Sequence, residues 1–172
     1  MESINLIVNC ISSFGTIVAF FALGYQILKE KIEKNEEQAN KISTWMDNDY
    51  KISDYQNKKA IIIYNQSNCP IYEIVFSIDD LYDGEGSVGT GEENCSCIDI
   101  LPPGKYVVEK EFRGAGMNHR FNSSITFRDH YGRYWTRDAR GILIREKSKN
   151  VIINKRKVCH PFAVASYRKI IE

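Results

Sequence analysis

The residues best suited to recognise a ligand surround one expected β-hairpin. Side chains two apart on a strand share a face, so Arg133, Trp135 and Arg137 are expected to project together, with Arg128 on the partner strand. An indole ring flanked by guanidinium groups suits an anionic small molecule or an acidic protein surface. The alternative is structural: Trp135 fills the core, and the arginines extend along its rim.

Residues suited to catalysis are sparse. The histidines are His119, His130 and His160, and each stands beside charged or turn residues rather than in a nucleophile-elbow or zinc-protease motif. The glycine-rich loop of P-loop nucleotide hydrolases is also missing from the sequence. We therefore expect a protein that is not an enzyme and that uses no cofactor.

Two sets of residues resemble metal ligands without matching a known site. Cys95 and Cys97, together with Cys159 and His160, offer zinc ligands, but structural zinc sites space paired ligands two to four residues apart. The acidic residues of segment 79–99 lack the order of a calcium-binding loop. Small buried thiols and a solvated loop explain both sets better, and no metal is expected.

The front of the chain predicts one membrane span. From Ser3 to Leu28 there is no charged side chain, and a helix of that length exceeds the roughly 30 Å hydrocarbon core of a bilayer. The basic cluster of Lys29, Lys31 and Lys34 follows at once. The positive-inside rule then places the amino terminus outside and residues 29–172 in the cytoplasm, as a single-pass protein of the cell membrane.

A different interpretation of the same segment is a secretory signal. Ala22-Leu23-Gly24 resembles a small-x-small cleavage site, although only Glu2 precedes the apolar stretch, where a signal peptide carries positive charge. The chain would then be an exported or surface-exposed enzyme or binding module, with a signal peptide or an uncleaved signal anchor in front.

A helical pattern is predicted to continue beyond the span as far as Trp45 or Met46. Its apolar positions, with one polar residue among them, are spaced 4, 3, 4, 3 and 4 apart, which is typical of a heptad seam. The seam could pair copies of the chain as a short coiled coil, or lie on the protein's own domain or on the membrane surface. Its positions are Leu28, Ile32, Asn35, Ala39, Ile42 and Met46.

The remaining residues predict one β-rich domain. Stretches rich in β-branched and aromatic residues, separated by turn residues, indicate six or seven short strands and hence an antiparallel β-sandwich or small barrel. Strands are expected at 59–65, 71–78, 105–113, 121–127, on both sides of a turn at 129–132, at 142–145 and at 151–153. Residues 79–99 are expected to form a long loop, and 163–171 a short helix or a last strand. The expected fold class is α plus all-β, with a transmembrane helix over 1–28, a charged helical connector over 29–55 and the β-domain over 56–172.

Charge is unevenly distributed along this domain. Residues 79–99 carry seven acidic side chains and no basic one, whereas residues 105–157 carry 14 lysines and arginines against five acidic residues. We therefore expect an acidic lobe and a basic lobe. The net charge of the whole chain is only +1, and no RNA-binding motif occurs, which argues against a nucleic-acid partner.

Behind the expected span and the charged helix with Trp45, three short motifs of turn and core residues follow in order. They are Asn65, Ser67, Pro70, Ile71 and Tyr72, then Leu101-Pro102-Pro103-Gly104, then Phe127, Asp129, Gly132, Trp135 and Arg137. This order, which covers most of the chain, resembles small uncharacterised single-pass membrane-anchored proteins of Gram-positive bacteria with a C-terminal β-rich domain. The resemblance implies a bacterial origin and this layout, and it implies no reaction.

Together these features predict a self-associating protein held in the lipid bilayer. Its cytoplasmic β-domain is expected to bind a ligand or partner as a sensor, effector or interaction module. In a bacterium such a layout would suit a membrane-disrupting defence effector or a tethered interaction module.

Overall fold

A computed structural model of the chain describes two compact units, Met1–Glu37 and Gln38–Glu172. The described residues are 2–47, 58–81, 95–111, 120–156 and 165–170, without the side chains of 2–14, 16, 35, 151 and 152. Most of the acidic glycine-rich segment, His119, Cys159 and His160 lie outside these ranges, so the predictions made for them lie outside the described residues.

The first unit is formed by helix α1, which spans Glu2–Asn40 and has its last three residues in the second unit. Proline is absent from this segment, so nothing interrupts the hydrogen bonds between successive turns. On its surface Lys29 Nζ lies 3.8 Å from Glu33 Oε1, one turn further along. Among the described residues, no helix combines the length and the apolar character that crossing a membrane requires.

The helix ends earlier than predicted. Residues Ile42–Asp47 form strand β1, which pairs antiparallel with β2, Lys58–Asn65. β-branched Ile42 and Thr44 favour a strand, Ile42 is fully buried there, and Thr44 Oγ1 donates a 2.9 Å hydrogen bond to the Ile62 carbonyl. The prediction of a helix as far as Trp45 or Met46 is therefore wrong.

This early end removes two positions from the predicted seam. Ile42 and Met46 lie in β1, and Ala39 is buried in the core of the second unit. Leu28 and Ile32 remain exposed on α1, at 62% and 56%. The β-rich unit also begins upstream of residue 55, where its boundary was expected.

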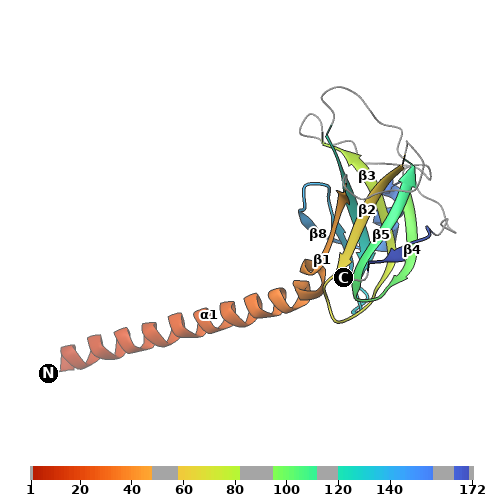
Figure 1. The fold of residues 1–172 in the computed structure, drawn as a ribbon. Coiled ribbons are helices and arrows are strands. Elements are labelled where there is room, and N and C mark those ends of the chain that lie inside the picture. Colours follow the sequence, from red (N-terminus) through yellow and green to blue (C-terminus); the bar gives the residue numbers. More distant parts are fainter. Residues whose placement is uncertain (1, 48–57, 82–94, 112–119, 157–164, 171–172) are drawn as a thin grey trace. The chain divides into compact units, whose positions relative to one another are not determined.

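Two antiparallel sheets make up the second unit, as Figure 1 shows, and the prediction of a β-rich domain is confirmed. The first sheet has the order β1-β2-β5-β9, where β5 is Gly104–Glu111 and β9 is Arg168–Lys169. The second has the order β4-β3-β6-β7-β8, formed by Cys95–Leu101, Ile71–Asp80, Phe121–Arg128, Tyr134–Arg137 and Leu143–Glu146.

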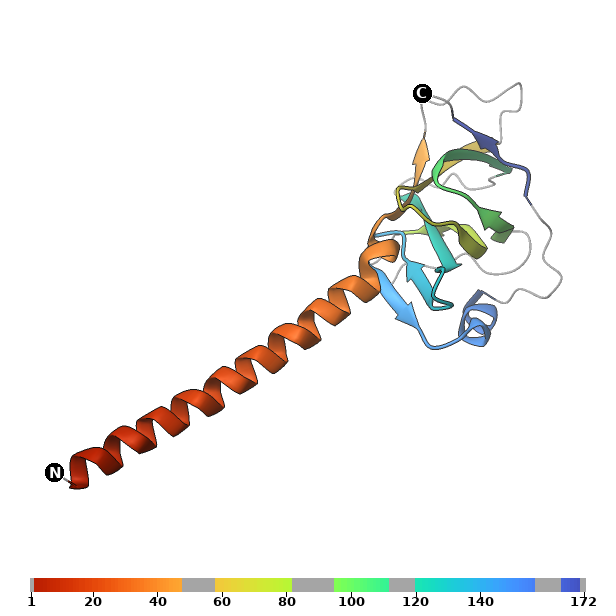
Figure 2. The ribbon, with the colours of Figure 1, turned by 90° about the horizontal axis from the view of Figure 1, so that it is seen from below.

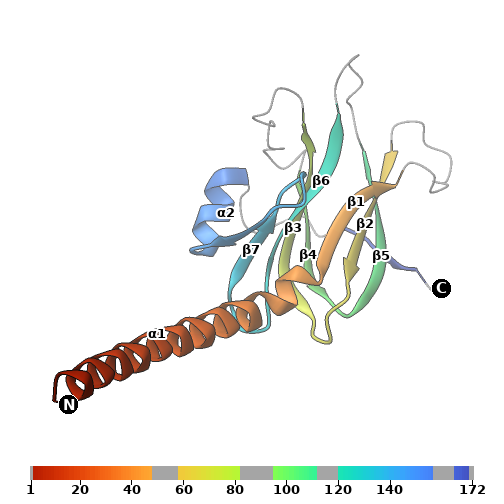
Figure 3. The ribbon, with the colours of Figure 1, turned by 90° about the vertical axis from the view of Figure 1, so that its left-hand side faces the viewer.

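The two sheets share one hydrophobic core. Alternate residues of the strands other than β9 point into it: Ile61 and Ile63 from the first sheet, Phe76 and Ile125 from the second, and Trp135 from β7. The short connection between β2 and β3 carries the chain from one sheet to the other (Figure 3). Burial on this inner face fixes the register of the strands. Smaller apolar clusters lie on the other faces: Ala60, Ile62 and Val107 on the first sheet, and Val75, Cys95 and Cys97 on the second.

Two local predictions are corrected. Residues 151–153, expected as a strand, belong to helix α2, Lys149–Arg156. Ser148 stands before the first helical residue, where serine is favoured as a cap, and three β-branched residues do not outweigh this local start. Residues 95–99, expected in a loop, form most of β4, which pairs with β3. The end of the chain, left open between helix and strand, contributes β9.

Candidate functional site

The outer face of the second sheet carries polar side chains at alternate positions. On β3 these are Ser77 and Asp79, and on β6 Ser124 and Thr126; their neighbours in sequence point into the core. Register pairs the hydroxyls across strands: Ser77 Oγ lies 3.0 Å from Ser124 Oγ, and Thr126 Oγ1 lies 3.1 Å from Thr136 Oγ1 on β7. The result is a row of hydroxyl groups across three strands.

Helix α2 contributes a buried guanidinium to one end of this row. Figure 2 shows α2 next to β8. Arg156 Nη1 donates to Ser77 Oγ at 2.6 Å and to Asp79 Oδ1 at 3.1 Å, and Nη2 donates to Ser124 Oγ at 2.7 Å. Both charged side chains are less than a tenth exposed. The two opposite charges neutralise each other, and the guanidinium also donates hydrogen bonds to two hydroxyl groups. Two charges can be buried at tolerable cost when they are paired and hydrogen-bonded in this way.

A second ion pair from α2 lies further along the same face. Lys155 Nζ donates to Glu146 Oε1 at 2.8 Å, and the Glu146 carboxylate also accepts from Thr136 Oγ1 at 3.0 Å. The Glu146 side chain is 5% exposed and that of Lys155 56% exposed. The carboxylate is thus fixed by the sheet, while the ammonium reaches it from the solvent side.

Between these ion pairs lies a cavity of about 340 Å³, a volume within the range of small-molecule sites. Its carboxylates already have partners: Asp79 and Glu146 in the ion pairs, and Asp138 with the backbone N–H groups of Arg140 and Ile142. A ligand that leaves these bonds intact is uncharged and rich in hydroxyl or amide groups. The lining residues are Asp79, Thr126, Thr136, Asp138, Ile144, Glu146, Lys155 and Arg156.

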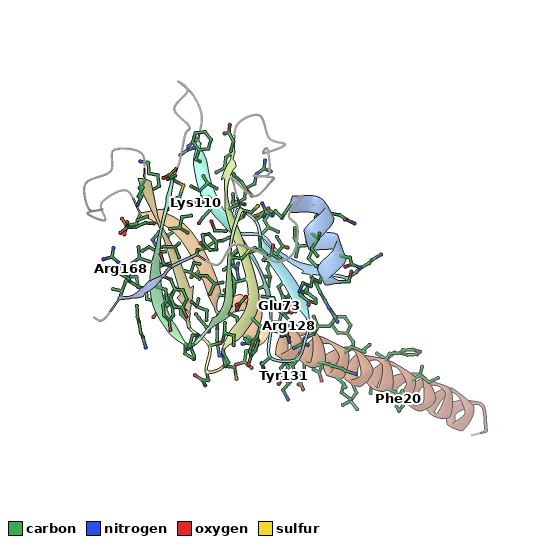
Figure 4. The ribbon with its side chains drawn as sticks, turned by 90° about the vertical axis from the view of Figure 1, so that its right-hand side faces the viewer. Phe20, Glu73, Lys110, Arg128, Tyr131 and Arg168 are labelled. Atoms are coloured by element: carbon green, nitrogen blue, oxygen red, sulfur yellow. The ribbon has the colours of Figure 1, made fainter. Side chains whose placement is uncertain are left out.

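A third ion pair connects the start of α2 to a strained residue. Glu73 has a positive φ of 49° at an irregularity in the pairing of β3 with β6, and its carboxylate lies 3.4 Å from Lys149 Nζ and 3.6 Å from Arg128 Nε. Figure 4 shows Glu73 and Arg128 next to each other. Tyr134 Oη donates to Glu73 Oε2 at 2.6 Å. Lys149, Lys155 and Arg156 therefore each join α2 to the sheet.

Burial and these interactions shift the pKa values of Glu73 and Tyr134. Partial burial raises the pKa of Glu73, but the hydrogen bond from Tyr134 and the charges of Lys149 and Arg128 outweigh it, so the pKa lies below its usual 4.5. Burial and the Glu73 carboxylate raise the pKa of Tyr134 to about 12. Glu73 is therefore ionised and Tyr134 protonated at neutral pH.

The predicted ligand residues around the hairpin have structural partners instead. Trp135 is 1% exposed, and its Nε1 donates to Asp129 Oδ2 at 2.9 Å. Arg133 Nε donates to the same oxygen at 2.9 Å and stacks over the ring of Tyr131. Arg128 stacks over Tyr72. The structure therefore matches the alternative in which Trp135 fills the core.

Arg137 binds the end of α1 and the start of β1. Its Nε donates to the Ile42 carbonyl at 2.7 Å and its Nη2 to the Ala39 carbonyl at 3.1 Å. The last carbonyls of a helix have no partner within the helix, and a guanidinium satisfies them well. Trp135 and Arg137 lie on one face of β7 as predicted, but that face is turned into the protein.

Gln38 lies in the same region and joins two loops of the second unit. Its Nε2 donates to the Pro70 carbonyl at 3.1 Å, and its Oε1 accepts from the backbone N–H of His130 at 3.0 Å. Asn65 Oδ1 accepts from the Ser67 hydroxyl at 2.6 Å within the first of these loops. Two of the motifs that carry the resemblance, at residues 65–72 and 127–137, thus contact Gln38–Asn40.

Sequence reasoning missed the cavity residues. The signal was present as polar side chains two apart, at Ser77 and Asp79, at Ser124 and Thr126, and at Thr136. They indicate strands with one polar face, but the helix that covers this face was expected as a strand.

Comparison with protein-family models, curated proteins and solved structures found no match for this chain. Among the described residues, no group of three or more histidine, cysteine or acidic side chains is arranged to hold a metal ion. The site is therefore characterised by its own geometry.

Proposed function

We propose that this protein is a non-enzymatic binding module, tethered to a membrane by α1, whose β-sandwich binds a small uncharged polar ligand beneath α2. The observation that carries the binding role is the cavity of about 340 Å³ with its paired charges and row of hydroxyls. In a bacterium such a module suits a sensor or a membrane-acting effector.

The cavity supports binding better than it supports a reaction. Its carboxylates are already fixed by a guanidinium, an ammonium or backbone N–H groups, so none is poised to move a proton. Thr136 donates to Glu146 and Thr126 to Thr136, so both hydroxyl oxygens keep acceptor capacity for a ligand that donates hydrogen bonds, and Ile144 offers an apolar contact. This mixture suits recognition of a polyhydroxylated or amide-rich molecule.

The tether is supported by the composition of α1. The segment from Ser3 to Leu28 carries no charge, and apolar side chains point outward all around the described part of it. Phe20 and Phe21 are 76% and 74% exposed, and Figure 4 shows Phe20 projecting from the helix. A helix that is apolar on every side needs an apolar solvent, and a lipid bilayer provides one.

Orientation and self-association complete the proposal. The basic cluster after the uncharged segment, Lys29, Lys31 and Lys34, favours a cytoplasmic position for the β-sandwich. The described cysteines Cys69, Cys95 and Cys97 are free thiols, which suits a reducing compartment.

Self-association is proposed through the exposed face of α1. Leu28 and Ile32 offer a short contact between copies of the helix in a homo-oligomer.

Analysis of molecules released from the purified protein tests the binding role. The full-length chain is extracted from membranes in mild detergent and denatured, and its small molecules are measured by mass spectrometry. Ile144→Trp fills the cavity from a side chain that is 42% exposed. We expect at least one small polar molecule to be retained by the natural sequence and reduced about tenfold in this variant.

Ile142→Trp is the matched control, because Ile142 is 55% exposed and does not line the cavity. It should retain the molecule at the level of the natural sequence. A profile of released molecules that is identical for all three proteins would contradict a ligand site beneath α2.

A further inference from the structure

Lys110 is a buried lysine without a carboxylate partner among the described residues. It is 9% exposed near the end of β5, at the opposite end of the strand from Gly104. Figure 4 shows it well away from Glu73 and Arg128. Lysine is rarely buried unless it is paired, because removing an ammonium from water without a counter-charge is costly. The position therefore calls for an explanation beyond packing.

The described polar group that contacts Lys110 is a hydroxyl. Lys110 Nζ donates a 2.7 Å hydrogen bond to Ser96 Oγ on β4, whereas Cys95 and Cys97, the neighbours of Ser96 in sequence, point to the other face of that strand and pack with Val75. Lys59 stands opposite Lys110 in the pairing of β2 with β5. Among the described residues, the group that accepts a hydrogen bond from Lys110 is therefore neutral.

The acidic neighbours in sequence do not neutralise it. Glu109 and Glu111 lie on the other face of β5, because successive residues of a strand point to opposite sides. Glu109 forms an ion pair with Arg168 there, and Glu111 is exposed. Neither carboxylate therefore faces an ammonium at position 110, whose described hydrogen-bond acceptor is the Ser96 hydroxyl.

Burial shifts the pKa of the Lys110 amine and the pKa values of the two thiols in opposite directions. It lowers the pKa of Lys110, and it raises the pKa of Cys95 and, with the neighbouring Cys95, raises that of Cys97 to about 12. The thiols therefore stay protonated and inert, whereas part of the amine is neutral at lower pH than in an exposed lysine. The amine is therefore the better nucleophile of the three groups.

We propose that Lys110 is a nucleophilic amine that captures small aldehydes and ketones as an imine, with Ser96 as its positioning residue. The neutral nitrogen attacks the carbonyl carbon and forms a C–N bond. Both amine hydrogens then leave with the carbonyl oxygen as one water molecule, and a C=N bond results. Ser96 Oγ, in hydrogen-bond contact with Nζ, can pass a proton to the departing oxygen.

Reductive methylation of the full-length protein in detergent tests this proposal. Formaldehyde supplies the carbonyl, and cyanoborohydride supplies the hydride that reduces the imine to a stable secondary amine. Peptide mass spectrometry then gives a labelling rate for each lysine between pH 6 and pH 10. We expect the rate at Lys110 to level off at a lower pH than the rate at exposed Lys147, and to exceed it about threefold or more at pH 7.

Two variants test whether the methyl label sits on Lys110 and whether Ser96 assists its attachment. Lys110→Arg keeps a positive charge and should lose the label at this position while leaving Lys147 unchanged. Ser96→Ala should lower the maximum rate at Lys110 several-fold, while that rate still levels off at a lower pH than at Lys147. Circular dichroism checks that both variants fold, and the pH profile of the natural sequence needs no variant at all.

Two results would overturn the proposal. In the first, the pH profile of Lys110 runs parallel to that of Lys147, as for an ordinary amine. In the second, inorganic phosphate selectively slows labelling at Lys110, which would show a charged amine that binds anions instead of a neutral nucleophile.

Discussion

Trp135 Nε1 and Arg133 Nε both donate to Oδ2 of Asp129, each at 2.9 Å. The other oxygen of the same carboxylate accepts the backbone N–H groups of Tyr131 and Arg133. One fully buried carboxylate therefore closes the turn between β6 and β7 and fixes the largest side chain of the core. Two of the four residues expected to meet an external ligand are therefore held by an internal anion.

Replacing Asp129 with asparagine should destabilise the second unit strongly. The amide keeps the shape of the carboxylate but loses its charge and places an N–H group where only acceptors fit. We expect the free energy of unfolding to fall by about 3–5 kcal/mol, as for a broken buried ion pair. Denaturant unfolding of the full-length chain in detergent, followed by tryptophan fluorescence, measures it. Asp99→Asn, at an exposed position, is the control and should have little effect.

Arg137 gives a second stability prediction. Arg137→Met removes the donors to the Ile42 and Ala39 carbonyls while keeping the aliphatic stem. Because a hydrogen bond from a charged donor contributes about 1.5–3 kcal/mol, we expect a loss of at least about 2 kcal/mol in the same unfolding measurement. Arg145→Met changes an exposed arginine on β8 and should be nearly neutral. Equal unfolding midpoints for the two variants would contradict the role of Arg137.

Glu73 predicts a specific dependence of stability on pH. Its pKa in the folded protein lies below its usual 4.5, so its stabilising contribution is present above pH 4.5 and is lost as the pH falls through the folded-state value. The difference in unfolding free energy between the natural sequence and Glu73→Gln should be largest at neutral pH and shrink below pH 4.5. It should stay below about 1 kcal/mol, because the ion pairs are partly exposed. Glu111→Gln, at an exposed position, should show no such trend.

Self-association through α1 predicts different outcomes for two isoleucines of the original seam. Ile32 is exposed on the helix, so Ile32→Asp should abolish a cross-linked oligomer in membranes while the β-sandwich stays folded. Ile42 is fully buried in β1, so Ile42→Asp should unfold the β-sandwich. Cross-linking and circular dichroism of the same preparations separate the two effects. An oligomer that survives Ile32→Asp would contradict a contact through this face.

Much of the fold follows from alternation in the sequence. The strand expected at 121–127 forms and places Ile125 and Phe127 in the core, and the turn expected at 129–132 closes with a 3.0 Å hydrogen bond from Gly132 N–H to the Asp129 carbonyl. These elements are governed by local turn residues and by which side of a strand is apolar. Both features depend on residues close together in the sequence, so they can be predicted from it.

The end of α1 and helix α2 were harder to predict because non-local contacts and caps decide them. Ile42 fits a heptad position of a helix as well as a position in a strand. Its pairing with Asn65 on β2 decides for the strand, and this pairing is not evident from the sequence. The site depended on the same kind of contact: Arg156 meets Asp79 across 77 positions of sequence. The arginines of the hairpin were expected to bind a ligand because the sequence did not reveal the carbonyls and carboxylates that they bind.

Alkaline extraction of membranes tests the tether on which the proposed function rests. Membranes from cells that express the full-length chain are washed with carbonate and sedimented. The protein should stay in the pellet, as should Ile32→Asp, which lies outside the uncharged segment Ser3 to Leu28. Phe20→Arg combined with Phe21→Arg should move it to the supernatant, because each charge at the bilayer centre costs about 2.5–3.5 kcal/mol on insertion scales. The natural sequence in the supernatant after this wash would contradict a membrane-tethered binding module.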